Sequence, residues 1–358
     1  MEKKVPTGLL LSGGIDSTLL LALAYKNGIR MPTFTVVNSA KENSSGTEDG
    51  KYSRIAANIY KSDHHELPID RNILNGFSDF IGSVDQPIGD SSYLLTSEIC
   101  KHASGSVKVL LSGAGADELF GGYNRHWAFY KYLVNKPLMD LLLPLSRSAF
   151  RYLPDLPGLS RVRHLQNMEK MAKSHDRSPE AMWLNMISFH EFKGAHGEFS
   201  EKSPSNSWMT WALWHDRTNY LVSDVLALTD KASMLHGLEV RVPYLDDRIV
   251  NHLGTIDSRS LMKQGRKWIL RQILIDNGGA KIANRSKEGF GLPLGNWFSD
   301  KKSAHLFEPL QKANAYIFEF FEKEKFDRIF SEHQSGKRDN GPLIWSILVL
   351  SHWLEGNF

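Results

Sequence analysis

Two short segments of the sequence place serine, glycine and aspartate in nearly the same order. The first reads LLLSGGIDS at residues 9–17, and the second reads LLSGAGADELFGG at residues 110–122. Each follows an apolar run, and the first leads into a segment with helical spacing. Backbone N–H groups and hydroxyls at a helix N-terminus favour anions, so a phosphate-binding loop is predicted here. The residues of the first loop expected to contact the phosphates are Ser12, Gly13, Gly14, Asp16, Ser17 and Thr18.

The aspartates of the two loops indicate a metal ion. A carboxylate beside phosphates is repulsive unless a cation such as Mg²⁺ lies between them. Both Asp16 and Asp117 follow strand-like runs, and ligands bind at the carboxyl ends of the strands in open α/β sheets. We therefore expect the two aspartates to share one magnesium site for ATP or pyrophosphate, although each could instead cap its helix. Neither loop fits the common P-loop or the dinucleotide-binding fingerprint.

The elements that must position these loops alternate along the first third of the chain. Segments with helical periodicity separate apolar, strand-like runs at residues 7–11, 32–37, 64–69 and 107–113. This order predicts an α/β lobe over residues 1–135, in which helices flank a parallel sheet with right-handed crossovers. Helical spacing dominates afterwards, so residues 136–358 are expected to form a mainly helical part that completes the active site.

Composition limits the classes of protein. Of 358 residues, 41% are hydrophobic and 23% are charged, which is typical of a folded enzyme rather than a disordered chain. A net charge of +3 is too small for a nucleic-acid binder, and the longest apolar runs are too short to cross a bilayer, so neither partner is expected. A single cysteine, Cys100, and an N-terminus without a signal-peptide pattern predict a cytoplasmic setting. Cys100 is expected to be a small buried residue of a helix, not a nucleophile.

Six ordered blocks of the sequence carry a family resemblance. The motifs SGGxDS and SGxGxDELFGGY are far more specific than one glycine-rich loop. The blocks are LLLSGGIDST, DQPIGDSS at 85–92, LLSGAGADELFGGY at 110–123, TDKASMLHGLEVRVPYLDDRIV at 229–250, RKWILR at 266–271 and KEGFGLPLGNW at 287–297. The chain resembles the synthetase domain of the asparagine synthetase family, whose α/β sheet is of the adenine-nucleotide alpha-hydrolase type.

The resemblance implies an activity. Members of this family adenylate a carboxylate with ATP and release pyrophosphate, after which ammonia or an amine nitrogen displaces AMP. Aspartate is the first candidate carboxylate, and ATP and Mg²⁺ are the expected cofactors. A ligase that makes another amide, in secondary metabolism or surface-sugar synthesis, is the closest alternative. A non-catalytic nucleotide-binding subunit and a nucleobase- or tRNA-modifying enzyme are further alternatives.

The resemblance also assigns roles to residues. Lys267 and Lys287 match lysines that similar enzymes place near the pyrophosphate and the adenylate, and Asp117 joins them as a catalytic residue. Backbone groups of Leu10 and Val36 are expected to hold the adenine. Ser112 and Gly113 are expected to contact the ribose or the adenylate.

Two departures from the family pattern affect the nitrogen-accepting half of the reaction. Asparagine synthetases carry a glutaminase domain before this region, whereas this sequence starts at the strand before the first loop. Nitrogen is therefore expected from free ammonia, from an amine, from a detached domain or from a separate glutaminase partner. Ala114 is the second departure, because asparagine synthetases usually have glutamate there and related β-lactam-forming enzymes have tyrosine. A methyl group cannot relay a proton.

Three other polar clusters have structural and functional interpretations. Arg241 and Asp246 are typical of the family and are expected to organise the helical part. Asp85, Asp90 and Ser91 either line the acceptor pocket or form a turn that caps itself. The HHE sequence at 64–66 is not expected to bind a metal, because neighbouring side chains on a strand point to opposite faces.

Overall fold

A computed structural model describes most of the chain. It covers residues 5–38, 48–82, 84–143, 171, 178–187, 207–285, 291–299, 303, 306–307, 310 and 315–357. The chain forms two compact units, each assembled from separate stretches of sequence. Unit 1 comprises Met1–Phe77, Asp90–Gly122 and Asp216–Pro293, and unit 2 comprises Ser78–Gly89, Tyr123–His215 and Leu294–Phe358. The division predicted between residues 135 and 136 is made along the sequence, and it stays a prediction.

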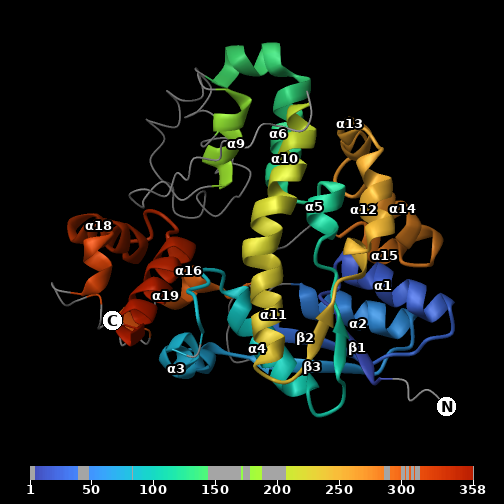
Figure 1. The fold of residues 1–358 in the computed structure, drawn as a ribbon, viewed down its shortest axis with the longest axis horizontal. Coiled ribbons are helices and arrows are strands. Elements are labelled where there is room, and N and C mark those ends of the chain that lie inside the picture. The colour runs from blue at the N-terminus through green and yellow to red at the C-terminus, as the bar shows by residue number, and fades with distance from the viewer. Residues whose placement is uncertain are drawn as a thin grey trace. The chain divides into compact units, whose positions relative to one another are not determined.

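Unit 1 is built on a five-stranded sheet in which every neighbouring pair is parallel (Figure 1). The strand order is β3-β2-β1-β4-β5. The strands are β1 Thr7–Leu10, β2 Thr33–Asn38, β3 His64–Ile69, β4 Val109–Leu111 and β5 Glu239–Arg241. The predicted α/β class and the four predicted strands are confirmed. The strand β5 was missed, because its three residues are one valine between two exposed charged residues and form no apolar run.

Helices cover both faces of this sheet. The α-helices of unit 1 are α1 Ile15–Lys26, α2 Asp49–Ile59, α4 Ser92–Ala103, α5 Ala116–Phe120, α11 Ala227–Met234, α12 Asp247–Gly254, α13 Ser258–Met262, α14 Trp268–Asp276 and α15 Ala280–Ala283. Shorter or wider helical turns are η1 Arg71–Gly76, the π-helical η3 Asp216–Leu226 and η4 Pro243–Leu245. Two consecutive residues of β2 show the two faces. Val36 packs in the cluster that includes Leu95 and Ile99 of α4, whereas Val37 lies against Gly50 of α2.

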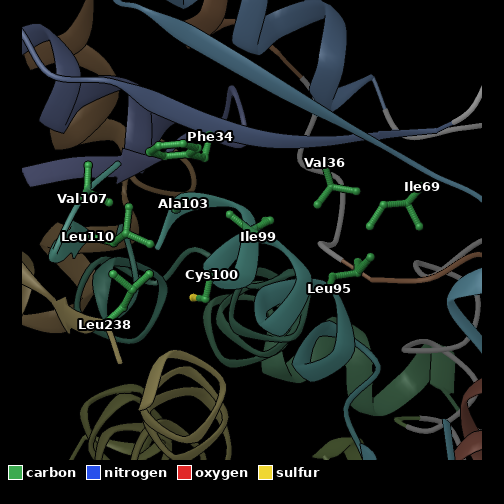
Figure 2. Close-up of a cluster of buried hydrophobic side chains, with 10 residues drawn as sticks. All are labelled: Phe34, Val36, Ile69, Leu95, Ile99, Cys100, Ala103, Val107, Leu110 and Leu238. Carbon is green, nitrogen blue, oxygen red and sulfur yellow. The ribbon is translucent and has the colours of Figure 1, made fainter. Parts of the chain in front are cut away.

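One hydrophobic cluster of unit 1 fills the space between the sheet and α4. Figure 2 shows this cluster, which contains Phe34, Val36, Ile69, Leu95, Ile99, Cys100, Ala103, Val107, Leu110 and Leu238. Cys100 is fully buried here, and burial raises the pKa of its thiol to about 12. The prediction that Cys100 is a small buried residue of a helix is confirmed, since a thiol with this pKa is inert near neutral pH.

Unit 2 is helical in its described parts. Its helices are α3 Phe77–Gly82, α6 Asn124–Val134, α9 Pro179–Ile187, α10 Trp208–His215, α16 Leu294–Phe298, η6 Tyr316–Glu319, α18 Lys323–Gln334 and α19 Gly341–Asn357. Aromatic contacts fix one group of helices: His126 of α6 stacks on Trp183 of α9 at a centroid distance of 5.5 Å. Throughout the part of the chain that the structure describes, each helix is too short or too polar to cross a bilayer.

Candidate active site

The two serine-glycine loops lie side by side because their strands are neighbours. Leu9 of β1 pairs with Leu111 of β4 in a parallel ladder, so both loops leave the same edge of the sheet. The chain runs from β1 outward to β3 and then crosses back to β4, which makes this edge a topological switch point. A Cβ atom on Gly113 would lie 2.9 Å from the Cβ atom of Asp16, so the second loop needs glycine to approach the first.

The serines perform the same structural task in both loops. The Ser12 hydroxyl accepts a hydrogen bond from the Gly14 N–H at 3.4 Å, and the Ser112 hydroxyl accepts one from the Ala114 N–H at 3.2 Å. Each serine therefore closes a tight turn directly after its strand. This shared turn gives a physical reason for the repeated Ser-Gly sequence. The contacts predicted for Ser12, Ser112 and Gly113 with the nucleotide stay predictions.

One lysine joins the aspartates of the two loops. The Lys267 Nζ atom lies 2.5 Å from Oδ2 of Asp16 and 2.7 Å from Oδ1 of Asp117. The lysine side chain is only 6% exposed, whereas the aspartate side chains are 21% and 20% exposed. Burial by itself would lower the pKa of the Lys267 ammonium, but Asp117 and Asp16 outweigh burial and raise it above the ordinary lysine value. Lys267 is therefore positively charged near neutral pH, and it lies between two partly exposed carboxylates.

The backbone around Lys267 is adapted to this contact. Lys267 precedes α14 with φ of 50°, a left-handed conformation that is uncommon for a residue with a side chain. Its N–H donates to the carbonyl of Phe120, the last residue of α5, at 3.3 Å. A methyl group on Gly122 would overlap with both Asp117 and Lys267. The glycine pair after α5 thus leaves room for the lysine to reach the aspartates.

The segment after β5 supports both loops, and sequence reasoning missed this role. The Tyr244 hydroxyl donates to the backbone carbonyl of Asp16 at 3.0 Å, and a Cβ atom on Gly115 would collide with Leu245. Burial, with a further contribution from Asp16, raises the pKa of Tyr244 well above its usual value, so the hydroxyl keeps its proton. The family block EVRVPYLDD contains Tyr244, but nothing in its sequence indicates a hydrogen bond to a backbone carbonyl of the first loop.

A second supporting residue that sequence reasoning missed is Arg285. Its Nη1 atom donates to the carbonyl of Ser12 at 2.9 Å, and its Nη2 atom forms an ion pair with Asp49 at the start of α2. The guanidinium also lies over the ring of Tyr52, 4.9 Å from its centroid. A lone arginine near the end of a helical region has no sequence signal of its own for such a contact.

The donor set at the loops fits a magnesium ion. Two carboxylates from adjacent loops converge on one cationic atom, and oxygen ligands of this kind suit Mg²⁺. Among the described residues, no group of three or more histidine, cysteine or acidic side chains is arranged to hold a metal by itself. Mg²⁺ is commonly bound through one or two carboxylates together with substrate phosphates, and two carboxylates meet at these loops. The assignment of the metal to Asp16 and Asp117 stays a prediction.

The remaining predicted site residues fall into three groups. Leu10 and Val36 lie in β1 and β2, and their side chains pack on the core cluster, which leaves only backbone groups for a ligand. Ser17 and Thr18 lie in the first turn of α1 with buried side chains, and the Ser17 hydroxyl is 3.3 Å from the Ser12 hydroxyl. Lys287 lies outside the described residues.

Comparisons with known proteins agree with this arrangement. The sequence model of the family described as asparagine synthase matches residues 1–355. The chain belongs to the asparagine synthase family. It is 26% identical over 369 residues to asparagine synthetase [glutamine-hydrolyzing] 1 of Bacillus subtilis (strain 168). That alignment covers 99% of this chain and 56% of the Bacillus protein. It is 27% identical over 376 residues to a putative asparagine synthetase [glutamine-hydrolyzing] of Mycobacterium bovis. That alignment covers 99% of this chain and 55% of the Mycobacterium protein.

These two matches cover nearly all of this chain but only part of each relative. The chain spans about half the length of these curated relatives. A shorter match, 33% identical over 190 residues, relates 52% of this chain to a putative asparagine synthetase [glutamine-hydrolyzing] 2 of Methanocaldococcus jannaschii. Membership of the family is therefore established, whereas the activity, the substrates and the partners of the chain are matters for proposal.

The DQPIGDSS block of this family member has structural contacts. The Asp90 carboxylate accepts a hydrogen bond from the Ser92 N–H at 2.8 Å at the start of α4. The Ser91 hydroxyl accepts one from the Leu292 N–H at 3.2 Å, which joins α4 to the family block at 287–297. Of the two interpretations left open, the self-capping turn describes Asp90 in this structure.

The other polar clusters also have structural contacts. Arg241 lies in β5, not in the helical part, and pairs with Glu239 at 2.7 Å. Asp246 caps α12, where hydrogen bonds from the side chain and backbone of Arg248 lower the pKa of its carboxyl to about 2. His64 is 2.9 Å from the hydroxyl of Thr33, whereas the neighbouring His65 stacks on Phe34, in accordance with opposite faces of the strand.

Proposed function

We propose that the chain is an ATP-dependent, AMP-forming amide ligase with a carboxylate as its first substrate. Aspartate is the first candidate for this carboxylate, and ammonia or an amine is the proposed nitrogen source. The observation that carries the proposal is the Lys267 cation, held between Asp16 and Asp117 where the two loops meet. Membership of the asparagine synthase family supports it.

The first step makes an acyl-adenylate. An oxygen of the substrate carboxylate attacks the α-phosphorus of ATP, and the bond from that phosphorus to the pyrophosphate oxygen breaks. The loop N–H groups at the start of α1 and the Lys267 ammonium offer positive charge to the departing pyrophosphate. Asp16 and Asp117 would hold Mg²⁺, which when bound supplies further charge neutralisation to the phosphates.

The second step forms the amide. The nitrogen lone pair attacks the acyl carbon, the bond from that carbon to the AMP oxygen breaks, and the nitrogen loses a proton. Ala114 lies in the second loop with a side chain that can accept no proton. We infer that the proton leaves to solvent or to the substrate rather than to this residue.

Ala114 also favours a second candidate function. A chain that binds ATP but transfers no nitrogen would act as a nucleotide-binding subunit beside a glutaminase partner. The Asp16-Lys267-Asp117 arrangement argues against this candidate, because a buried ammonium held between two partly exposed carboxylates could stabilise a leaving pyrophosphate, which binding alone does not require.

The experiment that tests the proposed function measures product formation directly. Pyrophosphate and AMP are measured with Mg-ATP and a panel of carboxylates, beginning with aspartate, each with and without ammonium. The proposal expects carboxylate-dependent pyrophosphate and an amide product only when a nitrogen source is present. Amide formation from a different acid would move the function to another ligase. ATP binding without pyrophosphate release across the panel would contradict the proposal and favour the subunit.

We further propose a cytoplasmic setting and small-molecule substrates, with no nucleic acid as a partner. The buried thiol of Cys100 and the modest net charge of +3 support these proposals. A separate glutaminase is the proposed macromolecular partner if ammonia is not taken up directly. Co-purification with a glutaminase from the native host, followed by glutamine-dependent amide formation, would test this association.

A further inference from the structure

Arg285 is held in a buried site below the first loop. Its side chain is 5% exposed and that of its partner Asp49 is 8% exposed. The guanidinium contacts three groups at once: the Ser12 carbonyl, the Asp49 carboxylate and the face of Tyr52. Lysine cannot reproduce these contacts, because a planar guanidinium offers several fixed donors whereas an ammonium is a single point charge.

The bond to the Ser12 carbonyl fixes the orientation of one peptide group. In a trans peptide the carbonyl of one residue and the N–H of the next point in opposite directions, and the described residues contain no cis peptide. With the Ser12 oxygen directed to Arg285, the Gly13 N–H must therefore point away from the guanidinium. An N–H held in this way on a phosphate-binding loop is a donor for an anion.

This peptide group needs to be held, because glycine makes it easy to rotate. Gly13 has φ of 66°, and glycine occupies positive and negative φ with similar ease. Rotation of the Ser12-Gly13 peptide would direct the carbonyl oxygen to the position of the N–H and would repel phosphate. Gly13 cannot be replaced by a stiffer residue, since a Cβ atom there would lie 2.5 Å from the Ser53 nitrogen of α2.

We propose that Arg285 is a positioning residue that holds the Ser12-Gly13 peptide with its N–H available for a nucleotide phosphate. Asp49 neutralises the buried charge, so Arg285 acts through the orientation of the loop and not as a free cation for the ligand. The proposal rests on the proposed function for the identity of the ligand. Arg285 precedes Lys287, the second lysine predicted for the site, by two residues in the sequence.

The test measures binding rather than turnover. Titration calorimetry compares Mg-ATP and adenosine for the wild-type chain, for Arg285→Met combined with Asp49→Asn, and for Arg285→Lys. The double variant removes both buried charges, so no unpaired charge remains. It is expected to weaken Mg-ATP binding about 10- to 100-fold, the value of a hydrogen bond to a charged group. Adenosine binding is expected to stay unchanged, because adenosine has no phosphate.

A matched control and a second variant keep the outcome decisive. Arg54→Met combined with Glu66→Gln removes the ion pair between Arg54 of α2 and Glu66 of β3, two residues that the described site does not include, and is expected to bind Mg-ATP normally. A folded double variant with wild-type Mg-ATP affinity would overturn the proposal. If the double variant does not fold, Arg285→Lys is the deciding variant. A Mg-ATP affinity below that of the wild-type chain supports the proposal, and a wild-type Mg-ATP affinity overturns it.

A readout without nucleotide separates this proposal from the proposed function. Deuterium exchange of residues 12–18 is expected to be faster in the folded variant than in the wild-type chain, because the loop has lost its anchor. If the wild-type chain binds Mg-ATP but makes no amide, the proposed ligase function is wrong, and the role of Arg285 can still be tested by Mg-ATP binding and deuterium exchange. Equal exchange rates together with equal Mg-ATP affinity would remove the role of Arg285.

Discussion

Lys267 combines three properties that are seldom found together in one residue. It is buried, it has a left-handed backbone conformation, and its ammonium bridges carboxylates from two loops. A residue with a side chain adopts such a conformation only where its surroundings impose it, and such residues gather at functional sites. The geometry is the reason to treat Lys267 as part of the chemistry rather than as a solvated helix residue.

Replacement of Lys267 by methionine is expected to reduce carboxylate-dependent pyrophosphate release about 100-fold or more, because the positive charge facing the leaving group is lost. Its contribution to stability also depends on pH. Since folding raises its pKa, this contribution is complete below the ordinary lysine pKa of 10.5 and is lost as pH rises through the folded value. The stability difference between wild type and variant should therefore narrow above pH 10.5 in urea unfolding. Lys263→Met, at an exposed lysine, should leave pyrophosphate release unchanged.

Gly122 is the residue whose substitution should disturb this contact most directly. In Gly122→Ala the new methyl group would overlap with Asp117 and Lys267, so we expect loss of pyrophosphate release and a destabilisation of about 1–3 kcal/mol. Thermal unfolding and the release assay measure the two effects. Gly254→Ala is the matched control, since a Cβ atom at the end of α12 meets no other atom within 4 Å. Equal behaviour of the two variants would contradict the described packing.

At the scale of elements, the site depends on the adjacency of β1 and β4. These strands are far apart in sequence, yet their loops meet because the chain crosses back over the sheet between β3 and β4. The short segment from β5 to η4 then packs on both loops through Tyr244 and Leu245. The site is therefore assembled from three loops at one sheet edge, with Lys267 provided by the residue that precedes α14.

Tyr244→Phe tests the support that η4 gives to the first loop. Loss of the hydrogen bond to the Asp16 carbonyl is expected to destabilise the protein by about 1 kcal/mol and to raise the KM for ATP. Urea unfolding and steady-state kinetics give the two values. Tyr25→Phe on the exposed side of α1 provides the comparison and should leave both unchanged.

Cys100 reports on the integrity of the layer between the sheet and α4. Because it is fully buried and its pKa is raised to about 12, it should resist iodoacetamide at pH 8 in the native protein and react fully in urea. Mass spectrometry of the alkylated chain measures this difference. Rapid modification of the native protein would show that α4 does not cover the sheet as described.

The sequence predicted the parts of this architecture that have a strong local pattern. Apolar strands between helical segments predicted the sheet, and the spacing of Asp16 and Asp117 after two strands predicted that they would meet. The contributions of Tyr244 and Arg285 were not predictable in this way. Each acts through a backbone carbonyl of the first loop from more than 200 positions away, and backbone acceptors have no sequence signature.

At the scale of the whole chain, the described site residues are concentrated in one of the two units. Unit 1 contains the sheet, both loops, Lys267 and Arg285, and it draws these residues from three separate stretches of sequence. The described residues that form the site, Asp16, Asp117, Tyr244, Lys267 and Arg285, all belong to unit 1. The length of the curated relatives, of which the chain spans about half, makes the source of nitrogen the main question at this scale.

We expect the 358-residue chain to use ammonium and not glutamine as its nitrogen source. Its one cysteine is buried with a raised pKa and cannot act as the nucleophile of a glutaminase. Amide formation should therefore rise with ammonium concentration and should not occur with glutamine alone, as measured by chromatography of the product. Glutamine-dependent turnover that survives Cys100→Ala would require another nucleophile in the chain.

In the proposed mechanism, Asp16 and Asp117 jointly support the cleavage of Mg-ATP. The most direct measurement is the rate of carboxylate-dependent pyrophosphate release at saturating Mg²⁺ and ATP for the wild-type chain, Asp16→Asn and Asp117→Asn. Each substitution is expected to lower this rate about 100-fold or more, while Asp63→Asn, at an 80% exposed side chain, leaves it unchanged. Wild-type rates of pyrophosphate release from both loop variants would contradict the claim.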